Sequence, residues 1–383
     1  MLLEWKLMRV QDIDLLRCID CNNLDNLELM QQHQIGEEII SGLLRCKSCN
    51  AIYPILNSTG VFFRRSEWQE YLTSSELATL IRLGFSKYFQ ENDLPGSGRK
   101  SLQAQVADNW EFQWREVYAW SKSDLDSGSI FNEKTFWEFI PLEPESIIGK
   151  VVYVACGGRG REAYHLAKHR PSLIIVAEIG AEVYDIYNLG IDERVPLMLL
   201  RCDVSSCPLR EAVVDVSICD HALQHVKYYA YGYSELVKAT KVGGKVGICV
   251  YSHENNFLMT KLIEPLKKII HKFPLKTIRI ISLAPAIVIY FIIHLIYIPF
   301  NKISPFADKA LPLNAHMLFW RNNSLQIVWL SCFDLIHAPI SYHFRKCEVR
   351  KLAKENMCEI NQIILTHGTT WSLICTKLPN VRG

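Results

Sequence analysis

The sequence between residues 150 and 252 alternates strand and helix patterns, and this alternation limits the available folds more than any other feature. It begins with VVYVACGGRGREAYHLA at 151–167, which reads as a buried strand, a glycine-rich turn and a helix. Further strand patterns follow at 173–179, 195–204 and 213–219, and a fifth follows Gly243-Gly244. Continuous apolar runs are typical of strands that are buried on both faces of a parallel sheet. We therefore expect an α/β fold with a doubly wound sheet.

Charged residues stand at the ends of three of these strands. An open parallel sheet binds its ligand beyond the carboxyl ends of its strands, so these residues are candidates for a site. Glu178 could accept hydrogen bonds from ribose hydroxyls, and Asp203 could accept one from an adenine amino group. Asp220 and His221 face the place where a substrate would lie. A single acid at a strand end is weak evidence, but the three in this order favour a nucleotide-like cofactor.

The glycines of the first loop do not have the G-x-G-x-x-G spacing of dinucleotide-binding proteins. With LQHV at 223–226 and the later KVGGKVGICVY, residues 145–252 resemble class I S-adenosylmethionine (SAM) methyltransferases, type 11-like. CEINQIILTHG and TTWSLICTKLP resemble the closing antiparallel strands of that fold. The resemblance implies a Rossmann-like seven-stranded doubly wound sheet and SAM as the cofactor. The cofactor-binding residues that it implies are Ala155, Gly157, Gly158, Gly160, Glu178, Asp203 and Asp220.

One departure concerns the acidic residue that these methyltransferases carry at the end of the first strand. Depending on the alignment, Tyr153 or Val154 stands at this position, and the loop holds an extra residue. We therefore expect no carboxylate from this strand beside the methionine amino group of the cofactor. A fold that no longer binds SAM and acts as a non-catalytic adaptor is an alternative.

Methyl transfer depends mainly on holding the acceptor in line with the sulfonium, and a hydroxyl acceptor also needs a base. We expect His221, with Asp220 beside it, to be this base. His225 lies where the superfamily often has a histidine, so it is either a structural residue or a substrate contact. The i, i+4 spacing of the two histidines could hold a metal, but no third ligand stands near them in the sequence.

Two CxxC pairs, in LRCIDC and LRCKSC, are separated by 24 residues near the start of the sequence. Two such knuckles can present four thiolates tetrahedrally to one zinc ion, around which a small module can fold. With Gly42 before the second pair and Tyr53-Pro54-Ile55 after it, residues 15–63 resemble the zinc ribbon of the small activator subunit of tRNA and release-factor methyltransferases. Two unrelated pairs, or a redox CxxC, are the alternatives. The expected ligands of a structural Zn²⁺ are Cys18, Cys21, Cys46 and Cys49.

The segment 66–145 is rich in aromatic residues and helix formers. Trp110, Trp114 and Val117 fall on one face of a helix. This helix either packs on the main domain or forms a wall of the active site, in which case Trp114 contacts the substrate. Similar helices precede the cofactor domain in zinc-ribbon methyltransferases.

The connection between the fifth and sixth strands has about 105 residues, where one helix would suffice. We expect it to form a helical lid. Within it, residues 281–300 carry no charge and follow a stretch of lysines. This run is long enough for a transmembrane helix, but Pro285, His294, Pro299 and its position inside a folded domain oppose a span. A buried lid helix, or an interfacial helix that gives 260–300 peripheral contact with a membrane, fits better, and both favour an apolar or amphipathic substrate.

A later segment, FDLIHAPISYHF, resembles a motif of fused zinc-ribbon methyltransferases. The resemblance implies that Tyr342 and His343 line the acceptor pocket, and ordinary packing between domains is the alternative.

Composition narrows the function further. The 383 residues have a net charge of +2, which does not indicate a nucleic-acid surface. An odd count of 13 cysteines and the lack of a visible signal peptide favour the cytoplasm, with membrane association through the lid. We expect an enzyme that methylates an oxygen or nitrogen of a small or amphipathic metabolite. The second hypothesis is an rRNA or tRNA methyltransferase, since bacterial rRNA guanine methyltransferases also join a zinc ribbon to this fold.

The expected domain order follows from these patterns, while the oligomeric state stays unknown. The expected domains are a zinc ribbon (1–65), a helical connector or cap (66–145), a SAM-binding domain (146–252), an apolar helical insertion (253–357) and the closing strands (358–383).

Overall fold

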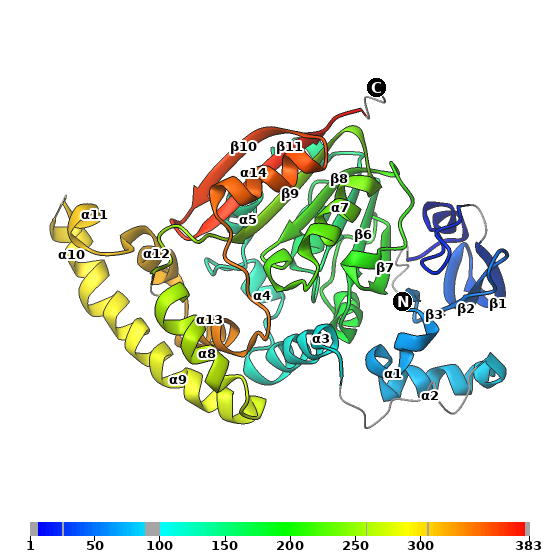
Figure 1. The fold of residues 1–383 in the computed structure, drawn as a ribbon, viewed down its shortest axis with the longest axis horizontal. Coiled ribbons are helices and arrows are strands. Elements are labelled where there is room, and N and C mark those ends of the chain that lie inside the picture. Colours follow the sequence, from blue (N-terminus) through cyan, green and yellow to red (C-terminus); the bar gives the residue numbers. More distant parts are fainter. Residues whose placement is uncertain (1–6, 25–26, 89–99, 258, 305, 380–383) are drawn as a thin grey trace.

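The computed structural model describes residues 7–24, 27–88, 100–257, 259–304 and 306–379. Parts of the predicted ribbon, connector, insertion and closing strands therefore lie outside the described residues. One mixed sheet of 11 strands runs through the molecule in the order β1-β2-β3-β4-β7-β6-β5-β8-β9-β11-β10 (Figure 1). The strands are β1 (Leu27–Ile35), β2 (Glu38–Cys46), β3 (Ile52–Leu56), β4 (Thr59–Phe62), β5 (Val151–Ala155), β6 (Leu173–Glu178), β7 (Leu197–Cys202), β8 (Val214–Asp220), β9 (Thr240–Tyr251), β10 (Cys358–Thr366) and β11 (Thr370–Lys377).

The predicted α/β doubly wound arrangement is present in the central part of the sheet. Strands β7, β6, β5, β8 and β9 are parallel, and β11 and β10 add an antiparallel pair at one edge. Their apolar side chains are buried almost throughout, as expected for strands that helices cover on both faces. Because the chain order reverses beside β5, the loops after β5 and β8 meet at the carboxyl edge, where such sheets bind ligands.

The predicted count of seven strands is wrong for the sheet as a whole. Strand β4 pairs in parallel with β7, with Thr59 opposite Leu199 and Phe62 opposite Cys202. The four N-terminal strands thus continue the central sheet instead of forming a separate one. The sequences of β4 and β7 do not show that the two strands pair, because the segments are far apart along the chain.

The N-terminal strands also share a hydrophobic core with the central sheet. Leu16, Tyr53 and Phe62 belong to the same buried cluster as Tyr153 and Val204. The backbone of Arg17 donates a hydrogen bond to the Pro208 carbonyl over 2.7 Å, and the Arg17 guanidinium forms an ion pair with Glu235. Unfolding of the N-terminal strands would therefore expose apolar surface on these strands and on the central sheet.

Helices from the connector and the insertion cover the carboxyl edge of the sheet (Figure 1). The connector helices are α1 (Trp68–Tyr71), α2 (Ser74–Arg82), α3 (Leu102–Phe112), a π-helical turn η5 (Gln113–Val117), α4 (Lys122–Leu125) and α5 (Glu133–Phe139). The central domain adds α6 (Arg161–Ala167), η7 (Ala181–Asn188) and α7 (Tyr229–Ala239). The insertion supplies η10 (Met259–Ile263), α8 (Glu264–Ile270), α9 (Leu275–Ile292), η11 (Ile293–Tyr297), α10 (Ile298–Ile303), α11 (Ala307–Ala310), α12 (Asn314–Phe319), α13 (Leu325–His337) and α14 (Lys346–Glu355).

Helices α9 and α13 pack side by side in the insertion. Ala286 of α9 lies in one buried cluster with Val328 and Cys332 of α13. The Trp329 indole N–H donates to the Arg279 carbonyl over 3.0 Å and to Ser282 Oγ over 2.9 Å. In the part of the chain that the structure describes, the continuous helix Leu275–Ile303 is long and apolar enough to cross a membrane, and only 22% of its most apolar window is buried.

Candidate active site

The glycine loop after β5 approaches its neighbours too closely for larger residues. A Cβ atom at Gly157 would lie 2.5 Å from Val176 Cγ1. A Cβ at Gly160 would lie 2.6 Å from Ile186 Cγ1, and its φ of +91° is in the left-handed region. The helix α6 begins directly after this loop, so its first backbone N–H groups face the carboxyl edge of the sheet.

Glu178 ends β6 and points back at the glycine loop. Its Oε2 accepts a hydrogen bond from the Gly158 N–H over 2.8 Å, and its Oε1 accepts from the N–H groups of Ile179 (2.7 Å) and Gly180 (3.1 Å). Burial raises the pKa of Glu178, while these backbone donors act in the opposite direction. The carboxylate therefore connects the loop to the end of β6 and still has lone-pair capacity toward the cavity.

Sequence reasoning missed Glu182, four residues farther along in η7. The residue is 1% exposed, and its Oε2 has no hydrogen-bond partner among the described residues. Burial and the nearby Glu178 raise the pKa of Glu182 well above its usual range. A buried acceptor without a partner is costly unless a ligand supplies a donor. The signal that could have found it is the E-x-x-x-E spacing of Glu178 and Glu182.

Tyr153 and Val154, the two positions at which the resemblance implies an acid at the end of the first strand of the central domain, are both buried in the sheet. Tyr153 points away from the glycine loop into the core, and its hydroxyl donates to Cys207 Sγ over 3.3 Å. Val154 lies in the core on the opposite face. Neither residue lines the cavity described below. Glu162, in the first turn of α6, does line it and forms an ion pair with Arg161, so an acid is present near the loop after all.

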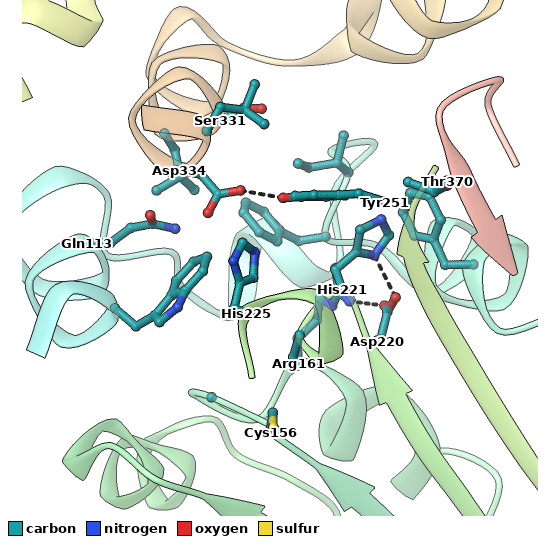
Figure 2. A pocket seen from close by; sticks show the side chains of 18 of the residues that line it. Gln113, Cys156, Arg161, Asp220, His221, His225, Tyr251, Ser331, Asp334 and Thr370 are labelled. Carbon is teal, nitrogen blue, oxygen red and sulfur yellow. Dashed lines mark hydrogen bonds and ion pairs between the residues drawn. The ribbon is translucent and has the colours of Figure 1, made fainter. Parts of the chain in front are cut away.

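Asp220 and His221 follow β8 as predicted, but both oxygens of Asp220 already have partners. One accepts from His221 Nδ1 over 2.7 Å, and the other forms an ion pair with Arg161 (Figure 2). Burial lowers the pKa of His221, but the Cys249 sulfur and Asp220 outweigh it and raise this pKa to about 10. A protonated imidazole cannot accept a proton, so this geometry does not favour His221 as the base. Ligand-type atoms of Asp220, His221 and Cys249 lie within 4.8 Å of one another, next to the Arg161 guanidinium.

His225 has the opposite ionisation. Its Nδ1 donates to the Ile340 carbonyl over 2.7 Å, and Nε2 has no partner among the described residues. Burial lowers the pKa of His225 to about 3, so the imidazole is neutral at pH 7. Trp110 of α3 packs against its ring with centroids 5.0 Å apart.

Asp334, on the inner face of α13, is a carboxylate that the catalytic prediction did not include. Its Oδ2 accepts a hydrogen bond from the Tyr251 hydroxyl over 2.9 Å (Figure 2). Its Oδ1 accepts no hydrogen bond from the described residues and lies 3.9 Å from His337 Nε2. Burial raises the pKa of Asp334 to about 6, although the Tyr251 hydrogen bond acts against this. Such a pKa suits a group that takes up a proton near neutral pH.

A cavity of about 330 Å³ joins these groups. Its floor is the glycine loop with Glu178 and Glu182, and its roof is the inner face of α13 with Asp334. His225 and Tyr251 lie between them. Its aromatic walls come from the connector and the insertion and consist of Trp110, Trp114, Trp120, Phe131, Phe139, Phe319 and Trp320.

The cavity wall includes some of the predicted site residues and leaves out others. Four residues of the predicted set, Ala155, Gly160, Asp203 and Tyr342, do not line it. Ala155 is buried within β5, and the Asp203 carboxylate accepts from the Ser205 N–H over 2.7 Å. Tyr342 packs on Tyr229 and directs its hydroxyl to the Lys227 carbonyl. The predicted residues that do line the cavity are Trp114, Gly157, Gly158, Glu178, Asp220, His221, His225 and His343.

The four predicted zinc ligands lie together in the N-terminal part. Sγ of Cys18 is 3.5 Å from that of Cys49, and Sγ of Cys21 is 3.6 Å from that of Cys46. All four sulfurs lie within 4.8 Å of one another. Zn–S bonds of about 2.3 Å in a tetrahedron place neighbouring sulfurs about 3.8 Å apart, so the cluster fits a structural Zn²⁺.

One family model matches the central part of the chain. Residues 152–248 match the family model Methyltransf_11, described as "Methyltransferase domain". No curated protein matches the chain. The matched segment covers the glycine loop, the ends of β6 and β8, and most of β9. The class that this domain and its sheet define is a SAM-dependent methyltransferase.

Several solved structures resemble the chain at low identity and low TM-score. A complex of the Haloferax volcanii Trm112 methyltransferase activator with a protein proposed to be a methyltransferase has 11% identity and a TM-score of 0.43, covering 73% of this chain and 100% of that chain. A Mesorhizobium loti SAM-dependent methyltransferase has 10% identity and a TM-score of 0.40, covering 66% and 100%. Magnesium protoporphyrin IX methyltransferase from Synechocystis with bound SAM has 11% identity and a TM-score of 0.39, covering 74% and 100%.

Proposed function

We propose that the protein transfers the methyl group of SAM to an oxygen or nitrogen of a small amphipathic molecule. The observation that carries this proposal is the continuity of the cavity. One space extends from the glycine loop and Glu178 to Asp334 on the insertion, with aromatic walls between them. A cofactor end and an acceptor end in one continuous space are what in-line transfer needs.

The cofactor end fits SAM through its buried acceptors. Glu178 and Glu182 would accept hydrogen bonds from ribose hydroxyls, and Glu162 supplies a further carboxylate near a cationic ligand. The glycine backbone at 157–160 leaves space for close approach of the cofactor. When bound, SAM supplies the electrophilic methyl group.

The acceptor end offers Asp334 as the base. Its free Oδ1 can accept a proton from a hydroxyl or ammonium group, while the Tyr251 hydroxyl holds Oδ2 in place. Neutral His225 can accept a hydrogen bond from the same acceptor group and so orient it. His221 stays protonated beside Asp220 and contributes positive charge at the cavity wall.

The walls favour an acceptor with an apolar body and one polar group. The rings of Trp114 and Trp120 lie 6.4 Å apart, and Phe139 packs on His221 at 4.3 Å. Aromatic walls of this kind bind apolar or planar groups, and the few polar atoms at the Asp334 end fix orientation. RNA is the second candidate for the methyl acceptor, because a chain with a net charge of only +2 has little excess positive charge to bind phosphates.

A labelling experiment separates these acceptors. The full chain is incubated with methyl-labelled SAM and either a small-molecule extract or total RNA. We expect label to appear in material that organic solvent extracts, and transfer to depend on Asp334. Label that enters RNA instead would support the RNA methyltransferase, and no transfer to either would support the adaptor.

We expect Glu178→Gln to weaken SAM binding by roughly 10- to 100-fold, because a charged acceptor is lost beside the ribose. Calorimetry with SAM measures this affinity. Glu355→Gln, at the exposed end of α14, is the matched control and should bind SAM normally. If Glu178→Gln keeps its melting temperature and its SAM affinity, the ribose role of Glu178 is refuted.

A further inference from the structure

The outer face of α9 and η11 presents a continuous apolar stripe to solvent. Intervals of three, four and seven residues recur among its members and place them on one side of the helix, away from the residues that pack on α13. Three of them, Ile280, Phe291 and Leu295, are 72%, 54% and 70% exposed. We define the α9 outer face as Ile280, Ile287, Val288, Phe291, Leu295 and Ile296. Figure 1 shows this helix in yellow along the outer edge of the molecule. Contiguous exposed apolar surface of this kind marks an interaction site.

Positive charge flanks this face at both ends. Lys268, Lys272 and Lys276 precede it and Lys302 follows it, all of them exposed. The structure gives none of these four lysines an ion pair among the described residues. The only acid between residues 255 and 304 is Glu264, which pairs with Lys267. An apolar stripe between lysine clusters matches a bilayer surface, where acyl chains lie beneath anionic head groups.

We propose that the α9 outer face binds the surface of an anionic lipid bilayer, with α9 lying in the plane of the interface. A second copy of the chain fits this face less well. Two-fold antiparallel pairing of α9 would bring Lys272 and Lys276 of one copy toward Lys302 of the other, and like charges repel. Anionic head groups neutralise both ends at once.

A membrane span is inconsistent with the packing of the opposite face. Ser282 and Ala286 of α9 are buried against α13, and Trp329 is hydrogen-bonded to Ser282. The other face of α13 carries Asp334 and lines the cavity. Crossing the bilayer would remove α9 from α13 and dismantle the roof of the cavity, whereas surface binding leaves both in place.

Vesicle flotation with the full chain tests this inference. The probes are vesicles of phosphatidylcholine alone and of phosphatidylcholine with phosphatidylglycerol. We expect the protein to float with the anionic vesicles, and high salt to weaken this binding. Phe291→Glu combined with Leu295→Glu should lower the bound fraction by roughly tenfold or more, because it places charge at acyl depth.

The matched control is Ile148→Glu. Ile148 is 57% exposed but precedes β5, at the opposite edge of the sheet from the insertion. Equal loss of flotation in this control, or no flotation of the unmodified protein, overturns the proposal. Self-association without lipid that the double variant abolishes would assign the face to a second copy instead. Binding that resists both high salt and alkaline carbonate would indicate a span.

Calorimetry with SAM on the same variants separates this inference from the proposed function. The bilayer inference goes beyond methyl transfer and does not depend on it. Normal SAM binding with failed flotation would overturn the bilayer inference alone.

Discussion

Asp334→Asn is expected to lower the rate of methyl transfer by about 10²- to 10⁴-fold, the usual contribution of a positioned general base. The amide keeps the size of the side chain and can still accept the Tyr251 hydrogen bond, so the cavity keeps its shape. SAM affinity should stay within about twofold, because Asp334 lies at the other end of the cavity. Single-turnover kinetics with labelled SAM and the acceptor from the labelling experiment measure the rate, and calorimetry measures the affinity.

The pH profile distinguishes Asp334 from the two histidines. A base must be deprotonated, so kcat/KM should fall about tenfold per pH unit below the pKa of Asp334, which is about 6. A limb near pH 3 would implicate His225, and one near pH 10 would implicate His221. Tyr251→Phe is the second variant. It removes a hydrogen bond that lowers the pKa of Asp334, so the limb should move to higher pH. An Asp334→Asn enzyme with full rate and an unchanged profile would rule out this base.

Cys46→Ser is expected to cause the largest loss of stability. Structural zinc contributes about 10–16 kcal/mol in small modules, which is comparable to the 5–15 kcal/mol that stabilise a whole domain. Because β4 pairs with β7 and the cores are continuous, unfolding should extend into the central sheet. Metal analysis should give one zinc per chain of the unmodified protein, and a chelator should lower its melting temperature as the variant does.

Cys347→Ser is the control, since Cys347 is exposed on α14 and distant from the cluster. It should keep both the zinc and the melting temperature. A Cys46→Ser protein that melts with the unmodified one would show that the four cysteines have no structural role.

The central fold could be predicted because its signals are local. Runs such as LIIVAE and LMLLRC are apolar except for Glu178 and Arg201 near their ends. The glycines at 157 and 160 are required by close contacts with Val176 and Ile186. The two CxxC pairs likewise identify the four expected metal ligands from the local sequence. The extension of the sheet could not be predicted, since β4 and β7 are far apart in the chain and neither strand shows in its own sequence which strand it pairs with.

The site was predicted less completely for a similar reason. Glu178 and His225 follow strands of the central domain, so their place at the carboxyl edge follows from topology. Asp334 faces them only because α13 folds back over the sheet, and no sequence pattern fixes that distance. The ionisation of His221 depends on Cys249, a neighbour from another strand. Its predicted role as the base rested on its place at the end of the fourth predicted strand, beside Asp220, and the sequence does not show how its imidazole is ionised.

The most direct test of the central claim is calorimetry of the full chain with SAM and with S-adenosylhomocysteine. We expect one site per chain for each ligand, with dissociation constants between roughly 1 μM and 1 mM, and a melting temperature that rises with ligand concentration. Absence of both heat and thermal shift at about 1 mM ligand would contradict the account, because the cavity would then not hold the methyl donor.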